Sequence, residues 1–284
     1  MRGAYLGRAI GALLAVFALL GAARPAAEPT VFRVAEQVKV PFSIMVKDAA
    51  EAKFVFIGEL HGVAEHHQIQ LSVIRVLHEA GVPLALGMEM FRAEHQRDLD
   101  RWIDGTLSDR TFRRLYENNW TLPWPLYRDI FEYARDHRIP IAGLNVPDEI
   151  IRKVARGGFS SLSPEDLKQL PSGISCSVDD RYMNFIRRAH GSGSLKHGKS
   201  FRFFCEAQMV WDAAMAKHLA DFSGREGSRM VVVLAGIAHA WRRGIPSQLD
   251  QYRPSAPSRV IVPLLTGTIE ELAVTSEDAD YVVW

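Results

Sequence analysis

The sequence predicts an α/β fold in which a mainly parallel central sheet is flanked by helices. Short apolar runs at 54–58, 84–88, 140–144 and 230–235 have the length and composition of buried strands. The stretches between them carry apolar residues at helical spacing, and this alternation favours parallel strands joined by right-handed crossovers. A chain of 284 residues, 48% of them hydrophobic, is long enough to form one large core.

The predicted elements follow one another closely as far as residue 144. In order they are an amphipathic segment at 38–50, a strand at 54–58, a helix with Ile69, Val73, Val76 and Leu77 on its apolar face, a strand at 84–88, helices at 93–104, 108–117 and 125–137, and a strand at 140–144. Gly81-Val82-Pro83 ends the first helix, because proline cannot continue it. Ser108 precedes the 108–117 helical pattern as a suitable N-cap.

The middle of the chain has a different composition. Residues 157–200 are rich in Gly, Ser and Pro, which predicts short helices and loops inserted into the domain as a lid or small subdomain. Beyond it we expect a long helix at 201–221 and strands at 230–235, 259–263 and 281–284.

The N-terminus has the pattern of a signal peptide over residues 1–23. Arg2 and Arg8 precede an apolar stretch at 10–20, and small residues follow it at 21–23. That stretch is short for a membrane span, which needs about 20 residues, although an uncleaved anchor is the alternative. We expect a leader at 24–50, one domain at 51–284 and no membrane span after cleavage. No cysteine follows the apolar stretch, so we expect a periplasmic or secreted protein without a lipid anchor.

Charge and cysteine content narrow the possible partners. Lys and Arg number 34 and Asp and Glu number 33, so no basic excess favours a nucleic-acid partner. The two cysteines, Cys176 and Cys205, have no metal-binding spacing. In an oxidising compartment they form either one disulfide or two separate thiols, and the sequence leaves both open.

Two matching tetrapeptides are the strongest indication of a site. Gly58-Glu59-Leu60-His61 and Gly236-Ile237-Ala238-His239 each follow a predicted strand, and Glu89 follows a third. Ligand sites of parallel sheets form at the carboxyl ends of the strands, so we expect Glu59, His61, Glu89 and His239 to converge. Such a set suits a general base or a metal site. Structural roles for each residue, as helix-start acid, salt-bridge partner or buried imidazole, stand as alternatives.

Other residues are weaker candidates. His66 and His67 begin a helix, where we expect them at the surface. The segment 120–127 is rich in aromatic residues and either lines an apolar ligand site or packs over the core. Tyr182 and His190 lie on a predicted helix, and both side-chain types can ligate haem iron, with simple packing as the alternative. The chain has no phosphate loop, dinucleotide fingerprint, nucleophile elbow or zinc helix.

Several motifs together resemble those of the ChaN-like haem-binding family. They are Phe56-Ile57-Gly58-Glu59-Leu60-His61, Gly87-Met88-Glu89-Met90-Phe91, Asn145-Val146-Pro147, Ala207-Gln208-Met209-Val210-Trp211-Asp212-Ala213-Ala214-Met215-Ala216, Leu234-Ala235-Gly236-Ile237-Ala238-His239 and Gly244-Ile245-Pro246. The resemblance covers residues 50–250 approximately. It implies an iron-regulated bacterial envelope protein that binds haem, with two stacked haems enclosed by a homodimer. A tyrosine ligates the iron in that family with histidine in support, and we assign these roles here to Tyr182 and His190. The missing lipid-anchor cysteine is a departure from that family.

The wider superfamily implies a second possibility. It includes Tiki-type metal-dependent proteases and erythromycin esterase-like hydrolases, and Glu59, His61, Glu89 and His239 match their active-site residues. An exported haem-binding protein for haem or iron uptake or handling is the expected function. A hydrolase that uses a divalent metal at those four residues is the alternative, and a purely structural cluster in a binding scaffold is the third.

Overall fold

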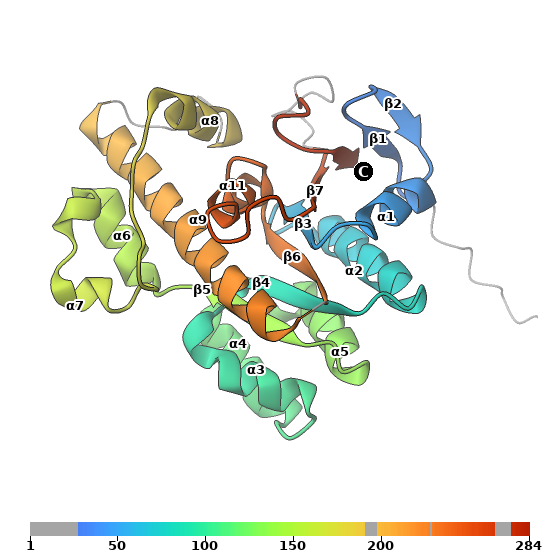
Figure 1. The fold of residues 1–284 in the computed structure, drawn as a ribbon. Coiled ribbons are helices and arrows are strands. Elements are labelled where there is room, and N and C mark those ends of the chain that lie inside the picture. Colours follow the sequence, from blue (N-terminus) through green and yellow to red (C-terminus); the bar gives the residue numbers. More distant parts are fainter. Residues whose placement is uncertain (1–27, 191–197, 228, 265–273) are drawn as a thin grey trace, which may run out of the picture.

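An eight-stranded sheet, covered by helices on both faces, forms the centre of the protein (Figure 1). The computed structural model describes residues 28–190, 198–227, 229–264 and 274–284. The strand order is β2-β1-β8-β7-β3-β6-β4-β5. All pairs from β8 to β5 are parallel, whereas β1 is antiparallel to both of its neighbours. The predicted α/β class is therefore confirmed. The predicted signal peptide at 1–23 lies outside the described residues.

The strands are β1 Val31–Arg33, β2 Val38–Val40, β3 Phe54–Glu59, β4 Leu84–Arg92, β5 Ile141–Asn145, β6 Met230–Gly236, β7 Ser258–Pro263 and β8 Tyr281–Val283. Strands β3, β5 and β6 are buried at every residue, because helices cover both faces of the sheet. This is why they read as continuous apolar runs. The two N-terminal strands were not predicted, since three residues carry too little pattern.

Each face of the sheet has its own layer of helices. The first layer holds α1 Phe42–Ala49, α2 Ala64–Glu79, α3 Gln96–Ile103, α4 Asp109–Asn119 and α5 Arg128–Asp136. The second holds α8 Asp180–His190, α9 Lys199–Arg225, α10 Ile237–Ala240 and α11 Ile245–Leu249. Along β3, Val55 and Ile57 pack with the first layer and Phe54 and Phe56 with the second. Successive side chains of a strand point to opposite faces of the sheet, so the core consists of two parts, one on each face.

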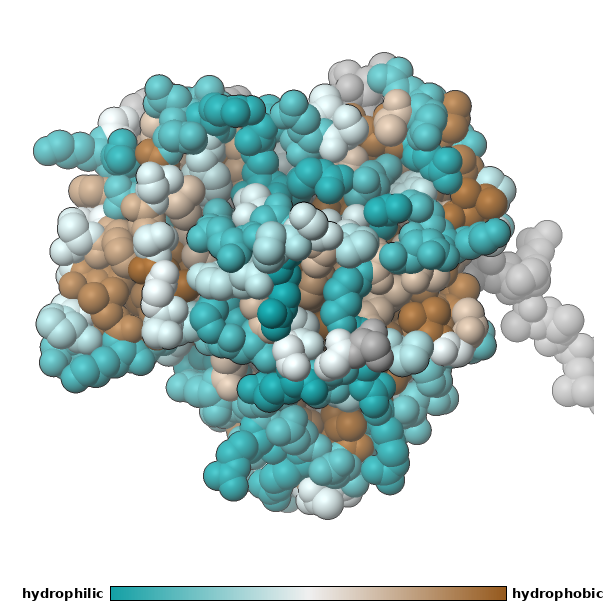
Figure 2. Space-filling model, in the orientation of Figure 1, coloured by the Kyte–Doolittle hydropathy of each residue, from teal (hydrophilic) through white to brown (hydrophobic). Residues whose placement is uncertain are grey.

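Short helices complete the fold. They are η1 Ala93–His95, η2 Trp124–Leu126, α6 Asp148–Gly157, η3 Phe159–Ser161 and α7 Pro164–Leu167. A third cluster of buried residues joins α6 to α9. Hydrophobic residues also gather at the surface on the left of the molecule, over α6 and α7 (Figure 2). The lid or subdomain role of residues 157–200 stays a prediction.

Two helix ends are formed as the sequence predicts. The side-chain oxygen of Ser108 accepts a hydrogen bond from the backbone N–H of Thr111 at the start of α4, as predicted for an N-cap. After α2, Gly81 adopts a φ of 78°, a conformation that favours glycine. No helix within the described ranges is long and apolar enough to cross a membrane.

Candidate functional site

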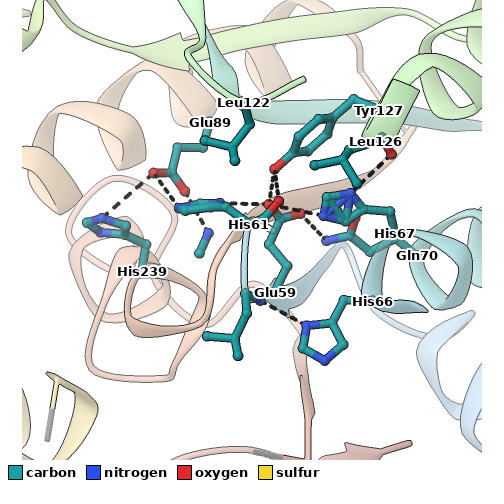
Figure 3. Close-up of polar contacts among 12 residues, drawn as sticks. Glu59, His61, His66, His67, Gln70, Glu89, Leu122, Leu126, Tyr127 and His239 are labelled. Carbon is teal, nitrogen blue, oxygen red and sulfur yellow. Dashed lines mark hydrogen bonds and ion pairs between the residues drawn. The ribbon is translucent and has the colours of Figure 1, made fainter. Parts of the chain in front are cut away.

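The structure brings Glu59, His61, Glu89 and His239 to one cleft of about 520 Å³. Because β3, β6 and β4 are adjacent and parallel, their carboxyl ends meet at the same edge of the sheet. Figure 3 shows the four side chains pointing toward one another. Apolar side chains also line the cleft, among them Trp120, Leu122, Ile151, Trp211 and Ile237. The expected convergence is thus seen, whereas the chemical roles of the four residues stay predictions.

Glycine explains why each tetrapeptide begins as it does. A Cβ atom at Gly58 would lie 3.2 Å from the Cα atom of Ile237, so the two motifs approach backbone to backbone. A Cβ atom at Gly236 would lie 2.9 Å from Nε2 of His61. Small residues at both positions therefore leave room for the other motif and for the imidazole.

Glu59 holds His61 in a fixed orientation. The Nδ1 atom of His61 lies 2.7 Å from Oε1 of Glu59, so Nε2 is the ring nitrogen left to face the cleft. The side chain of His61 is 33% exposed, compared with 8% for His239. Of these two imidazoles, His61 is therefore the more accessible to a ligand. The ring of Trp120 contacts it edge-on, at a centroid distance of 4.9 Å.

Glu59 is itself held by buried partners on the first helical layer. Gln70 donates to Oε2 at 2.8 Å, and the hydroxyl of Tyr127 donates to Oε1. His67 places Nε2 3.8 Å from the same oxygen, while its Nδ1 donates to the carbonyl of Leu126. The expected surface position of His67 is therefore wrong, because the side chain is only 3% exposed on the inner face of α2. Satisfied in this way, a buried carboxylate can keep its charge.

Glu89 lies between the two imidazoles. Its Oε2 accepts the backbone N–H of Gly236 at 2.6 Å. Its Oε1 lies 3.9 Å from Nε2 of His61 and 3.9 Å from Nε2 of His239. One carboxylate oxygen therefore faces both ring nitrogens that point to the cleft.

Asp212 completes the site from α9. Its Oδ1 lies 2.6 Å from Nδ1 of His239, and its Oδ2 accepts from the hydroxyl of Tyr182 at 3.2 Å. Asp212 is 1% exposed. Sequence analysis did not select Asp212 as a site residue, although it lies directly after Trp211 in the motif at 207–216. An acidic residue on the apolar face of a long helix was the available signal, because such a carboxylate needs a partner.

These contacts determine the charges of the site. Burial opposes a charge on His239, but Glu89 and Asp212 outweigh it and raise its pKa to about 9. Burial likewise opposes a charge on His61, yet Glu59 and Glu89 raise its pKa. Burial raises the pKa of Asp212 in spite of His239. The two carboxylates therefore favour the protonated form of the His239 imidazole.

The other predicted residues have different positions. Tyr182 is buried and does not line the cleft, and burial next to Asp212 raises the pKa of its phenol. The side chain of His190 lies outside the part of the chain that the structure describes. The assignment of these two residues to haem iron stays a prediction. Of the 120–127 segment, Trp124 packs against Phe131 in the core and Trp120 lines the cleft, where a role in binding a ligand stays a prediction.

The structure also bears on the metal and disulfide chemistry that the sequence left open. Among the residues described, no group of three or more His, Cys, Asp or Glu side chains is placed to hold a metal ion. The alternative metal site at Glu59, His61, Glu89 and His239 therefore has no support. Cys176 and Cys205 are both free thiols here. Of the two interpretations that the sequence left open, the structure has the unpaired one.

The family described as "Haem-binding uptake, Tiki superfamily, ChaN" matches residues 45–249. No curated protein sequence is a significant match.

Two solved structures share the fold. One shows cofacial haem binding to ChaN of Campylobacter jejuni, with a TM-score of 0.69, 19% identity, and coverage of 90% of this chain and 96% of that one. The other is a mutant of the erythromycin esterase EreC in its open conformation, with a TM-score of 0.52, 14% identity, and coverage of 90% and 82%. At these identities the likeness is one of fold. The family match extends over most of the sequence, and the chain therefore belongs to the ChaN family of the Tiki superfamily, which is described as haem-binding uptake.

Proposed function

We propose that this protein binds haem and serves haem or iron uptake or handling. The proposed binding site is the cleft lined by Glu59, His61, Glu89 and His239, here named the strand-end cleft. The observation that carries the proposal is the cleft itself, where the partly exposed imidazole of His61, oriented by Glu59, lies beside apolar side chains. Membership of the haem-binding family supports it. The volume of about 520 Å³ is within the range of about 300–1,000 Å³ that is usual for small-molecule and cofactor sites.

The side chains of the cleft fit haem in three respects. Trp120 and Trp211 offer flat apolar surfaces on opposite segments of the chain. His61 has its Nδ1 bonded to a carboxylate, the arrangement that orients histidine ligands of metals. Arg152 is 65% exposed on the cleft lining, where its guanidinium can pair with a propionate. When bound, haem would supply an iron able to take axial ligands.

The two candidate iron ligands have different surroundings in the structure. His61 already faces the cleft, so it needs no rearrangement. Tyr182 donates its hydroxyl to Asp212, and that bond would have to break before the phenol reached a ligand in the cleft. We therefore propose His61 as the first residue to test, with Tyr182 and His190 as the family-based assignment beside it.

A hemin titration tests the proposal. The purified chain should shift and sharpen the Soret band of hemin and saturate at a defined stoichiometry. His61→Ala should change the Soret position and weaken binding, whereas His78→Ala, a histidine change on α2 away from the cleft, should not. Tyr182→Phe and His190→Ala report on the other assignment. A wild-type protein that leaves the hemin spectrum unchanged would refute the function, and changes confined to the last two variants would move the ligand to α8.

Two finer parts of the proposal concern assembly and location. We propose export because residues 1–23 have the pattern of a signal peptide, and a homodimer around stacked haems because the family resemblance implies one. Light scattering with and without hemin measures the mass of the particle. Mass spectrometry of protein from a periplasmic extract measures whether the chain begins after the predicted cleavage site. An intact N-terminus in cytoplasmic protein alone would contradict export.

A further inference from the structure

A second cavity, here named the edge cavity, lies beside β5, the strand at one edge of the sheet. Its volume is about 570 Å³. Gly143 and Asn145 of β5, Leu170 after α7, and His218 with Arg225 on α9 are among the residues that line it. It shares no lining residue with the strand-end cleft. Like that cleft, it opens near the carboxyl end of a parallel strand, where ligand sites of such sheets form.

His218 lines the edge cavity, and its ring keeps one hydrogen-bond acceptor. Its Nδ1 lies 2.8 Å from the carbonyl oxygen of Leu144. A carbonyl only accepts, so Nδ1 carries the proton of the neutral ring and Nε2 keeps a lone pair. Burial lowers the pKa of His218, which favours this neutral form. The ring therefore suits a ligand hydroxyl, which can donate to Nε2.

Basic side chains predominate in the cavity lining once ion pairs are considered. The lining acid Glu94 lies 3.2 Å from Arg92, and Asp221 lies 2.5 Å from Lys217. No ion pair of Arg225 lies within the described ranges, and the guanidinium lies 5.9 Å from the ring centroid of Phe222. Among the described residues, the ion pair of Lys168 is with Glu165 at 3.9 Å, and both side chains are 76% exposed. A pair so exposed contributes little, so both cations are available to an anion.

We propose that the edge cavity binds a small hydroxylated organic anion of the sugar-phosphate class. His218 accepts a hydrogen bond from a ligand hydroxyl, and Arg225 and Lys168 bind the anionic group. Of the residues that the structure describes, the edge cavity is lined by more polar than apolar ones and by no tryptophan, whereas Trp120 and Trp211 line the strand-end cleft, so the two sites suit different ligands. The proposal is independent of the proposed haem function.

Calorimetry with three probes separates the two kinds of contact. Glucose 6-phosphate has both hydroxyls and charge, glucose has only hydroxyls, and inorganic phosphate has only charge. Glucose 6-phosphate should bind at least about tenfold more tightly than either of the others at low ionic strength. Equal affinity for glucose 6-phosphate and phosphate would overturn the inference, and so would the absence of heat with all three.

Matched variants locate the site. Arg225→Gln should weaken glucose 6-phosphate binding about tenfold. Arg229 pairs with Glu226 at 3.2 Å and does not line the cavity, so it offers a control. Arg229→Gln should leave glucose 6-phosphate binding unchanged. Equal effects of the two variants would point to charge alone and would overturn the site.

Nuclear magnetic resonance adds a readout that needs no substitution. The ¹⁵N signal of Nε2 in His218 should shift with glucose 6-phosphate and not with phosphate, and an unmoved signal would exclude the hydroxyl contact. Protein saturated with hemin should bind glucose 6-phosphate with the same affinity. Competition between the two ligands would place the anion in the strand-end cleft instead and refute the edge cavity.

Discussion

Replacing Asp212 by asparagine should make the stability of the protein less dependent on pH. In the wild type, Oδ1 of Asp212 lies 2.6 Å from Nδ1 of His239, and Asp212 is 1% exposed. An asparagine keeps the shape and one acceptor oxygen but removes the charge. Hydrogen bonds to charged groups contribute about 1.5–3 kcal/mol, so Asp212→Asn should lose about that much at pH 6.

The sign of the pH dependence follows from His239. Glu89 and Asp212, acting against burial, raise its pKa from 6.5 to about 9 in the folded chain. A group with a raised folded pKa contributes its full stability below the unfolded pKa and loses it as the pH rises through the folded value. The difference between the two values corresponds to about 3 kcal/mol at most. Wild-type stability should therefore fall between about pH 6.5 and 9.

Because Asp212 causes only part of this rise and Glu89 remains, the variant should keep a smaller slope. The difference in free energy of unfolding between the wild type and Asp212→Asn should thus narrow as the pH rises. Urea unfolding of haem-free protein at several pH values measures it. Asp221→Asn on the same helix is the matched control. Its exposed ion pair with Lys217 contributes about 0.3–0.5 kcal/mol. A gap between wild type and Asp212→Asn that stays constant from pH 6 to 9 would refute the ion pair as its cause.

Three further changes are measured by urea unfolding at pH 7. Gly236→Ala should cost about 1–3 kcal/mol, because its Cβ would lie 2.9 Å from Nε2 of His61. Gly62→Ala, which meets nothing within 4 Å, should avoid that cost, and equal losses would contradict the steric reason. Ser108→Ala should cost about 1 kcal/mol through the lost N-cap, and no loss would mean that the cap is dispensable. Gln96→Ala should cost about 1–2 kcal/mol, because its amide bonds the free edge of β5 at 2.7 and 3.1 Å, and unchanged stability would show that water replaces both bonds.

Much of the fold was accessible from the sequence because its determinants are local. Strands β3 and β6 are buried at every residue, so each appears as an uninterrupted apolar run. Gly81 and Ser108 mark helix ends through their own backbone and side-chain chemistry. Helix α6 was not predicted, although Pro147 directly precedes it and Asp148 and Glu149 lie in its first turn.

The candidate site was accessible only in part. The convergence of Glu59, His61, Glu89 and His239 could be expected, because each follows a strand and parallel strands end at one edge of a sheet. The partners of these residues come from elsewhere. Tyr127 is 68 positions from Glu59, and Asp212 is 27 positions from His239. No periodicity or spacing rule connects residues so far apart in the chain.

By itself, therefore, the sequence determined the fold class, the family and the edge of the sheet at which the site forms. Each of these depends on residues that are close in the chain or on motifs shared with the family. Only the tertiary structure decided that Asp212 holds His239, that His67 is buried beside Glu59, and that Tyr182 lies behind the cleft. The physical reason is that the partners of a buried charge are chosen by packing between layers, which no local pattern records.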